Sequence, residues 1–374
     1  MNTPLCHVNP WFSAGRPAPS GGVNVASGRG RTYNLRMRIN RAWTLAARPE
    51  GLFRQTDFLW TEAPVPAIGD GQVLVRQILL SLDPTNRGWA NAGSTYLPSL
   101  PIGSVMRGLG LGVVEESRHP AFAAGDYVQG LLGWQVYLVS DGSKLGRVER
   151  RPGVPLDAYM SVFSHIGATA YFGLLEVGRP VPGETLVVSG AAGAVGSLVG
   201  QIGKIAGCRV VGIAGTEEKC RWLTEELGFD AAVSYRDGSL PRTLRRACPS
   251  GVDVVFENVG GDVMDASLMQ LNNQARIVLC GMIAQYNEPV PPPGPRFLVN
   301  VLTRRARIEG FIVLDYARRY PEAFDKLGAW IAEGRLRYRS DIVQGLEHAP
   351  AAVNRLFDGS NTGKLMVQVS GDQP

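Results

Sequence analysis

A glycine-rich turn between an apolar strand and an apolar helix constrains the fold of this chain more than any other feature. The run Thr185–Ser189 is rich in β-branched residues and predicts a buried strand. Three glycines spaced three apart then follow, at Gly190, Gly193 and Gly196. Apolar residues recur on one helical face over residues 195–206, and a second apolar strand is predicted at Arg209–Ala214. This order of elements is typical of the first half of a dinucleotide-binding fold.

The glycines of this turn suit a phosphate ligand. One glycine allows the tight turn, one lets the backbone approach a pyrophosphate, and one lets the helix pack close to the strand. The helix N-terminus then offers free N–H groups to phosphate oxygens. Because the spacing is not the usual G-x-G-x-x-G, a glycine-rich helix start without a ligand stays an alternative. A membrane span over residues 185–203 is disfavoured by the glycines, serines and glutamine within it.

Length, charge and cysteine usage indicate an ordinary protein of about two domains. The net charge of +5 is uneven, because residues 1–36 carry four arginines and no acid. The remaining 34 basic and 33 acidic residues nearly cancel, which gives no electrostatic footprint for nucleic acid. The five cysteines are scattered without a C-x-x-C pair, which predicts no metal site and favours a reducing, cytoplasmic location.

The chain divides into three regions by composition. Residues 1–36 are rich in Gly, Pro, Ser and Arg and are predicted to be a disordered N-terminal extension. Its prolines and glycines disfavour an organelle transit peptide, and Met37 is the alternative natural start. Short β-rich runs broken by Gly, Pro and Asp over residues 41–151 predict a small, partly open β-barrel. From about residue 161 helices and strands alternate, which predicts a parallel sheet covered by helices on both faces.

Several blocks of the sequence match one family in order. The chain resembles the zinc-free medium-chain dehydrogenase/reductases, and within them the branch of leukotriene B4 dehydrogenase/prostaglandin reductase, plant 2-alkenal reductases and bacterial curcumin reductases. The resemblance covers nearly the whole chain from Met37 onward. Its main blocks are AAGAVGS at 191–197, GTEEK at 215–219, FENVGG at 256–261, CGMIAQYN at 280–287 and NTGK at 361–364.

The resemblance implies a domain organisation. It implies an α/β fold with a discontinuous GroES-like catalytic domain, a partly open β-barrel made of residues 37–160 and 334–374. A Rossmann NADPH-binding domain with a doubly wound parallel sheet, residues 161–333, is inserted between them. Members of the family are typically homodimers, so the resemblance also implies a dimer.

The cofactor preference can be examined from the residues themselves. An NAD site needs an acid after the second strand to bind the ribose 2′-OH, and residues 214–216 hold none. Lys219 matches the family lysine at the 2′-phosphate and Tyr235 its aromatic neighbour, although a solvated surface lysine is the alternative. Asn258 and Asn361 match cofactor contacts but also read as turn formers. The other cofactor positions implied by the resemblance are Thr169, Gly193, Ala194, Val195, Gly196, Cys280, Gly281, Tyr286, Phe311, Ile312 and Val313.

The resemblance implies reduction of an activated C=C bond. Hydride delivery to the β-carbon needs a hydrogen-bond donor at the carbonyl oxygen and a source for the proton, without a metal. Tyr96 and Tyr286 are the candidate donors, and Thr303 is a third because it stands where some relatives have a catalytic tyrosine. A lone histidine before a helix, His165, is interpreted as structural. Two alternatives stay open: a quinone reductase of the same fold, and a weakly catalytic NADPH-binding sensor or scaffold.

Overall fold

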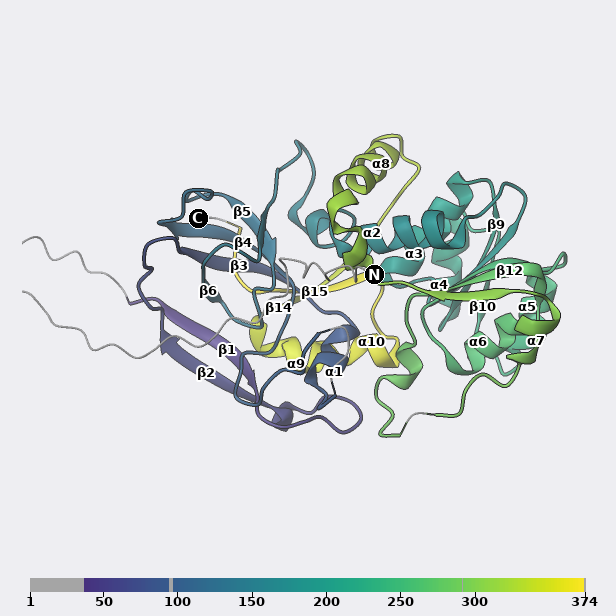
Figure 1. Ribbon diagram of the computed structural model, residues 1–374, viewed down its shortest axis with the longest axis horizontal. Coiled ribbons are helices and arrows are strands. Elements are labelled where there is room, and N and C mark those ends of the chain that lie inside the picture. The colour runs from purple at the N-terminus through teal and green to yellow at the C-terminus, as the bar shows by residue number, and fades with distance from the viewer. Residues whose placement is uncertain (1–36, 94–96, 291, 373–374) are drawn as a thin grey trace, which may run out of the picture.

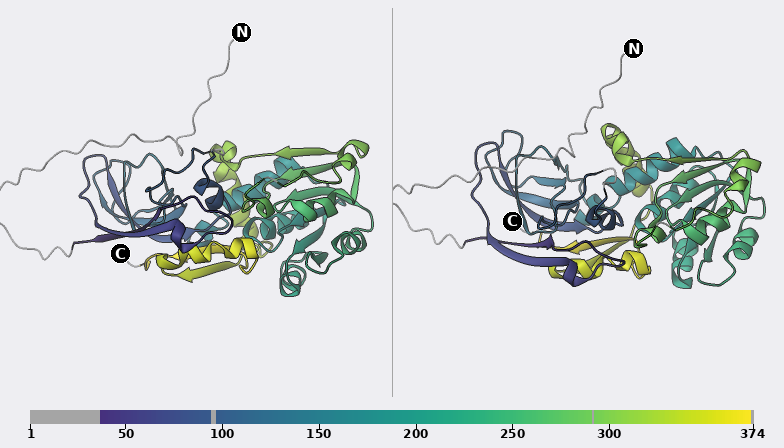
Figure 2. Two further views of the ribbon diagram at one scale, coloured as in Figure 1. Left: turned by 90° about the horizontal axis from the view of Figure 1, so that it is seen from below. Right: turned by 60° about the horizontal axis from the view of Figure 1, so that its bottom comes forward.

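The structure is a computed structural model, and it describes residues 37–93, 97–290 and 292–372 (Figure 1). The predicted extension of residues 1–36 and the candidate Tyr96 lie outside these described residues. Two lobes lie side by side, one built on a largely antiparallel sheet and the other on a parallel sheet (Figure 2). In the described part of the chain, no helix is both long and apolar enough to cross a membrane.

The first lobe is built around β3, a strand that is buried at every position. Its sheet runs in the order β14–β15–β3–β4–β5–β7, and β6 also pairs with β3. A separate antiparallel ribbon of β1 and β2 shares an apolar core with this sheet. The bounds are β1 (Ile39–Leu45), β2 (Phe58–Pro64), β3 (Val73–Ser81), β4 (Gly110–Ser117), β5 (Tyr127–Gly130), β6 (Tyr137–Ser140), β7 (Leu145–Arg147), β14 (Ser340–Gln344) and β15 (Lys364–Gln368).

The C-terminal segment returns to this first lobe. β15 pairs with β3 in the antiparallel sense, and β14 pairs with β15 in the parallel sense. Figure 2 shows the C-terminal elements, in yellow, lying against the lobe formed by the start of the chain. The segment also touches the second lobe, because Gly363 forms a bridge with Gly193 and its N–H donates to the carbonyl of Ala192 at 3.1 Å. The glycine-rich turn therefore lies where the two lobes meet.

The second lobe is a six-stranded sheet in the order β10–β9–β8–β11–β12–β13, with every neighbouring pair parallel. The order of the strands reverses between β8 and β11, and such a switch point is where α/β sheets bind ligands. The bounds are β8 (Thr185–Ser189), β9 (Arg209–Ala214), β10 (Ala231–Ser234), β11 (Val252–Glu257), β12 (Leu271–Leu279) and β13 (Arg307–Gly310). The predicted doubly wound fold is confirmed.

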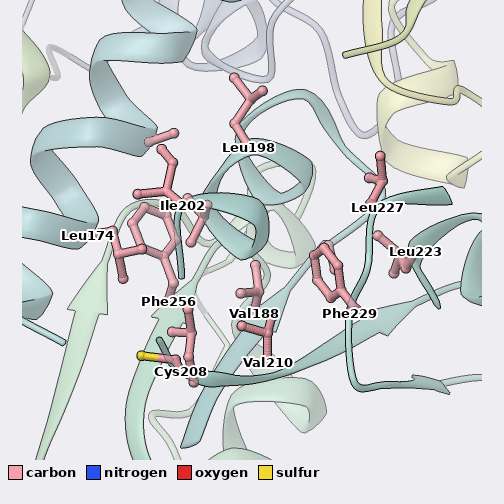
Figure 3. Close-up of a cluster of buried hydrophobic side chains, with 14 of the residues drawn as sticks. Leu174, Val188, Leu198, Ile202, Cys208, Val210, Leu223, Leu227, Phe229 and Phe256 are labelled. Carbon is pink, nitrogen blue, oxygen red and sulfur yellow. The ribbon is translucent and has the colours of Figure 1, made fainter. Parts of the chain in front are cut away.

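Helices cover both faces of this sheet, because its strands are apolar on both sides. Val188 packs with α2 and α3 in one core, shown in Figure 3, while Val187 packs with α5 and α6 in another. The helices are α1 (Thr85–Ala90), α2 (His165–Phe172), α3 (Ala194–Ile205), α4 (Glu217–Arg221), α5 (Leu240–Ala247), α6 (Gly261–Leu268), α7 (Val299–Thr303), α8 (Tyr320–Ala332), α9 (Ala349–Ala352) and α10 (Arg355–Asp358).

Candidate functional site

The glycine-rich turn links β8 to the N-terminus of α3. Gly190 adopts a left-handed conformation with φ of 58°, and a Cβ on Gly196 would lie 2.4 Å from the Gly190 carbonyl oxygen. Larger residues at these positions would therefore displace the turn. Gly193 caps α3 without a side-chain bond, so no side chain of the described residues competes with an anion for the first N–H groups of the helix, on Ala194 and Val195. The turn fits the pyrophosphate of a dinucleotide.

Two cations and an aromatic ring gather at the carboxyl ends of β9 and β10. The N–H of Lys219 bonds to the Thr216 cap, and its Nζ donates to the carbonyl of Gly359 at 2.6 Å. The Arg236 guanidinium lies 5.7 Å from the centre of the Tyr235 ring and donates to the carbonyl of Asp358. Burial and the neighbouring Arg236 both lower the pKa of Lys219.

This pair of cations suits a ligand with a phosphate on its ribose, because it offers two charge-assisted donors where NAD sites place an acid. The sequence predicted Lys219 and Tyr235 but missed Arg236. The only local signal for Arg236 was its position directly after the aromatic residue, at the end of a strand.

A polar network fixes the turn at the switch point. The Ser189 hydroxyl donates to Oε1 of Glu257 at 2.7 Å, and the same oxygen accepts the N–H groups of residues 259 and 260. Asn258 donates from Nδ2 to the Ser189 carbonyl at 2.7 Å. Glu257 is fully buried and burial raises its pKa, while its Oε2 has no partner among the described residues. The predicted Asn258 is thus a member of a rigid turn, and Glu257 was missed.

A cavity of about 500 Å³ opens at the carboxyl ends of β12 and β13. The Tyr286 hydroxyl accepts the N–H of Met282 at 3.2 Å, and burial raises the pKa of this tyrosine. The phenol therefore stays protonated and keeps its own O–H for a ligand. Asp315 is the charged residue of the lining, and sequence analysis did not select it. The lining residues are Leu279, Cys280, Gly281, Met282, Tyr286, Gly310, Phe311, Ile312 and Asp315.

The surroundings of Cys280, the cysteine in this cavity, do not support a redox role. Burial raises the pKa of Cys280 to about 12, so the thiol stays protonated at neutral pH. Cys280 packs instead against the core that contains Phe256 and Val278. Gly281 follows it, and a Cβ there would lie 3.3 Å from the Tyr286 hydroxyl. A glycine at this position leaves room between the loop and the phenol.

The remaining predicted residues fall in different places. Thr169 is buried on α2, and Asn361 is buried beside Gly363, the residue that bridges to the glycine turn. Val313 begins a 3-10 helix that follows shortly after β13 ends at Gly310. The chain bends there to cross the end of the sheet, and Val313 packs on α2 outside the cavity lining.

Thr303 lies away from the cavity within this chain. It is exposed on α7, which leads into the amino end of β13, whereas the cavity opens at the carboxyl end of that strand. The carbonyl of Arg304, the next residue, accepts from the N–H of Gln274 in the middle of β12. The structure therefore does not bring Thr303 to the other candidate residues of its own chain.

Comparison with known families places these features in one class of proteins. Residues 41–148 match the family model described as the N-terminal domain of oxidoreductase, and residues 194–331 match the one described as zinc-binding dehydrogenase. The fold, with a barrel lobe and a parallel-sheet lobe that meet at a glycine turn, is that of an oxidoreductase with two domains. The chain belongs to the medium-chain dehydrogenase/reductases, in the zinc-free branch, as the sequence predicted.

Individual relatives support the same placement. The chain is 45% identical over 338 residues to the NADPH-dependent curcumin reductase of Escherichia coli (strain K12), covering 89% of this chain and 98% of the relative. It is 41% identical over 305 residues to the 2-alkenal reductase (NADP(+)-dependent) of Nicotiana tabacum, covering 81% and 88%. The crystal structure of CurA in complex with NADPH from Vibrio vulnificus superposes with a TM-score of 0.84 at 42% identity, covering 89% and 100%.

The described residues do not fit the zinc ion that one family description mentions. No group of three or more His, Cys, Asp or Glu side chains within residues 37–93, 97–290 and 292–372 could hold a metal. Zinc in proteins is held by three or four such ligands. We therefore derive no chemical step through a metal.

Proposed function

We propose that this protein is an NADPH-dependent reductase of the C=C bond of α,β-unsaturated ketones and aldehydes. The observation that carries the proposal is the cavity at the carboxyl ends of β12 and β13. Its walls are largely apolar, and a protonated phenol, Tyr286, is its hydroxyl donor. Such a cavity suits a small conjugated acceptor that develops charge on its carbonyl oxygen.

The cofactor would extend along the carboxyl edge of the parallel sheet. The turn of Gly193 and Gly196, with the N–H groups of Ala194 and Val195, would hold the pyrophosphate. The cluster of Lys219, Tyr235 and Arg236 would hold the 2′-phosphate. The nicotinamide would enter the cavity beside Cys280, Gly281, Phe311 and Ile312. The remaining proposed contacts with the cofactor, which lie outside that lining, are Thr169, Asn258, Val313 and Asn361. When bound, NADPH supplies the hydride.

Tyr286 would stabilise the reacting acceptor. Its hydroxyl already accepts from a backbone N–H, which orients the phenol and leaves the O–H as a donor. A donor aimed at the acceptor oxygen stabilises the enolate that forms when hydride reaches the β-carbon. Conjugate reduction spreads the charge over the enolate, so a neutral donor suffices where reduction of a simple carbonyl would need stronger stabilisation of an alkoxide. Tyr96, outside the described residues, stays a second proposed donor.

We also propose the division into a catalytic domain of residues 37–160 and 334–374 and an NADPH-binding domain of residues 161–333. The pairing of β15 with β3 supports it, since the end of the chain completes the first sheet. Four cysteines are free thiols, which supports a cytoplasmic location: Cys208, Cys220, Cys248 and Cys280.

We also propose a homodimer, because one edge of the parallel sheet and an apolar segment beside it are exposed. β13 is an edge strand, and such edges are usually covered or paired. The neighbouring segment exposes Leu298, Val299 and Leu302, whose relative accessibilities are 49%, 60% and 78%. A second copy placed against this edge would cover an apolar surface of a kind that commonly marks interfaces.

A substrate panel tests the proposed function. NADPH oxidation is followed with purified protein and a set of enones, enals and quinones at equal concentrations. We expect turnover of enones and enals, with the saturated carbonyl compound as product. Turnover of quinones alone would favour the quinone reductase, and cofactor binding without any turnover would favour the sensor.

A further inference from the structure

The two cations of the proposed 2′-phosphate site hold the C-terminal segment of the barrel lobe. Nζ of Lys219 donates to the carbonyl of Gly359 at 2.6 Å, and Nη2 of Arg236 donates to the carbonyl of Asp358 at 2.9 Å. Both acceptors belong to residues 358–362, a turn that begins at the end of α10 and that we call the α10 turn. The contact therefore joins the parallel-sheet lobe to the lobe that β14 and β15 complete (Figure 1).

The base of the α10 turn is fixed within its own lobe. The Arg355 guanidinium makes two bonds to the carboxylate of Asp341 on β14, at 2.6 and 3.2 Å. The same carboxylate accepts the N–H of Thr362 at 3.2 Å. The carbonyls at the tip of the turn, residues 358 and 359, accept instead from the two cations of the other lobe. Loss of the tip contacts would therefore free the turn without breaking its attachment to β14.

Gly359 gives the tip its shape. Its φ is 74° and its ψ is 25°, which is the left-handed region that costs free energy for a residue with a side chain. A Cβ at this position would lie 3.5 Å from the Tyr235 hydroxyl, which is an ordinary contact distance. An alanine at residue 359 would therefore strain the backbone of the tip without a clash against the ring.

A 2′-phosphate needs the same donors as the tip. Burial lowers the pKa of Lys219, and the charge of Arg236 lowers it further, because like charges repel. Asp358, at the tip itself, acts in the opposite direction, so the tip supplies part of the negative charge that a phosphate would bring. A phosphate bonds to such donors more strongly than a neutral carbonyl does, since both partners are charged. The neutral 2′-hydroxyl of NADH has no such advantage.

We propose that the α10 turn is a competitor built into the chain, whose tip and the 2′-phosphate of NADPH exchange for Lys219 and Arg236. The inference rests on the proposed placement of the 2′-phosphate and adds to it a coupling between the phosphate and the contact of the two lobes. Binding of the phosphate frees the turn, and the return of the turn displaces the phosphate. The coupling is reciprocal, so the free energy needed to release the tip lowers the affinity for the cofactor by the same amount.

The α10 turn leads directly to the glycine-rich turn. Nδ2 of Asn361 donates to the carbonyl of Gly363 at 3.2 Å, and the N–H of Gly363 donates to the carbonyl of Ala192 at 3.1 Å. Release of the tip therefore acts on a short segment whose other end lies against the proposed pyrophosphate site. The two ends of the proposed phosphate-binding region are connected in this way through the barrel lobe.

Hydrogen exchange of the full-length protein, read by mass spectrometry, tests the release of the turn. The probes are adenosine 2′,5′-bisphosphate and adenosine 5′-monophosphate at saturation, because they differ by the 2′-phosphate alone. We expect the N–H groups of residues 360–362 to exchange about tenfold faster with the bisphosphate, the ratio expected when a hydrogen bond to a charged group is lost. The double variant Lys219→Met with Arg236→Met should show the fast exchange without a probe.

A matched pair of glycine variants tests the competition. Gly359→Ala strains the tip and leaves both cations in place. Gly334→Ala is the control, because this exposed glycine after α8 has a φ of 71° and no atom of the described residues within 4 Å of an added Cβ. We expect calorimetric titration of Gly359→Ala to give a Kd of NADPH about fivefold lower than in the wild type, since release of the tip relieves the strain. The Kd of NADH, and both constants of the control, should match the wild type.

Three results would overturn the inference. Exchange of residues 360–362 that is equal or slower with the bisphosphate would show that the phosphate does not release the turn. A Kd of NADPH that is unchanged or higher in Gly359→Ala would show that the tip does not compete. Equal Kd values of the two probes would show that the phosphate does not reach the cations. These measurements involve no turnover, so a failure of the proposed reductase function appears separately, in the substrate panel.

Discussion

Replacing Lys364 with methionine should destabilise the protein strongly. The substitution keeps an unbranched side chain only one heavy atom shorter but removes the charge that pairs with Asp83 at 3.0 Å, and both side chains of the native pair are more than nine-tenths buried. An ionised carboxylate would then remain in the interior, and its remaining side-chain partners among the described residues would be the Ser81 hydroxyl and His165. Breaking a buried ion pair by removing one partner costs about 3–5 kcal/mol, so we expect a loss of this size in the free energy of unfolding.

The double variant Asp83→Leu with Lys364→Met separates the cost of the orphaned charge from the cost of lost packing. Because it removes both charges, it should recover most of the loss. The surface pair of Asp70 and Arg118, whose side chains are 100% and 60% exposed, provides a matched control. Asp70→Ala should change the free energy of unfolding by less than about 1 kcal/mol.

Urea unfolding of these variants, followed by circular dichroism and tryptophan fluorescence, measures the effect. The pKa of Asp83 is depressed in the folded state, so its contribution is fully present above its ordinary value of 3.8 and is lost as pH falls below it. The deficit of Lys364→Met should therefore be largest near neutral pH and shrink in acid. A deficit no larger than that of Asp70→Ala, or one that grows in acid, would refute the reasoning.

Three further predictions concern the cofactor, metals and assembly. Lys219→Met should raise the Kd of NADPH by about tenfold or more while the Kd of NADH stays unchanged. Fluorescence titration measures both constants, with the substitution Lys326→Met at an exposed lysine as control. Equal weakening of NADPH and NADH binding would contradict a role of Lys219 at the 2′-phosphate. Activity should survive dialysis against EDTA, since the described residues contain no group of three metal-ligating side chains; activity lost with bound zinc would contradict this. Leu302→Glu should shift the protein to monomers in sedimentation velocity, and a retained dimer would place the interface elsewhere.

The sequence predicted the parts of the fold that are set by local burial. β8 and β9 have the predicted bounds because each is a short apolar run buried on both faces between polar residues. The glycine turn could be predicted because its backbone conformation needs glycine. Local signals are weaker for β12, which begins at Leu271 and passes through polar residues before its apolar end.

Parts of the fold and of the candidate site depend on contacts between distant residues and could not be predicted. Asp83 and Lys364 are 281 residues apart, and neither one alone distinguishes a buried ion pair from two surface charges. Nε2 of His165 lies 3.5 Å from the same carboxylate, a contact that the sequence alone does not show. Thr303 shows the opposite case. It stands where some relatives have a catalytic tyrosine, which suggested a role, but within this chain α7 lies at the amino end of β13, away from the cavity.

The position of the transferred hydride tests the central claim most directly. The protein is given NADPH deuterated at C4 and an α,β-unsaturated ketone, and the product is examined by NMR and mass spectrometry. The account predicts a saturated ketone with deuterium on the β-carbon, because Tyr286 can stabilise an enolate in a cavity where the described residues form no group of three metal-ligating side chains. Deuterium on the carbinol carbon of an allylic alcohol would show direct carbonyl reduction and would contradict the account.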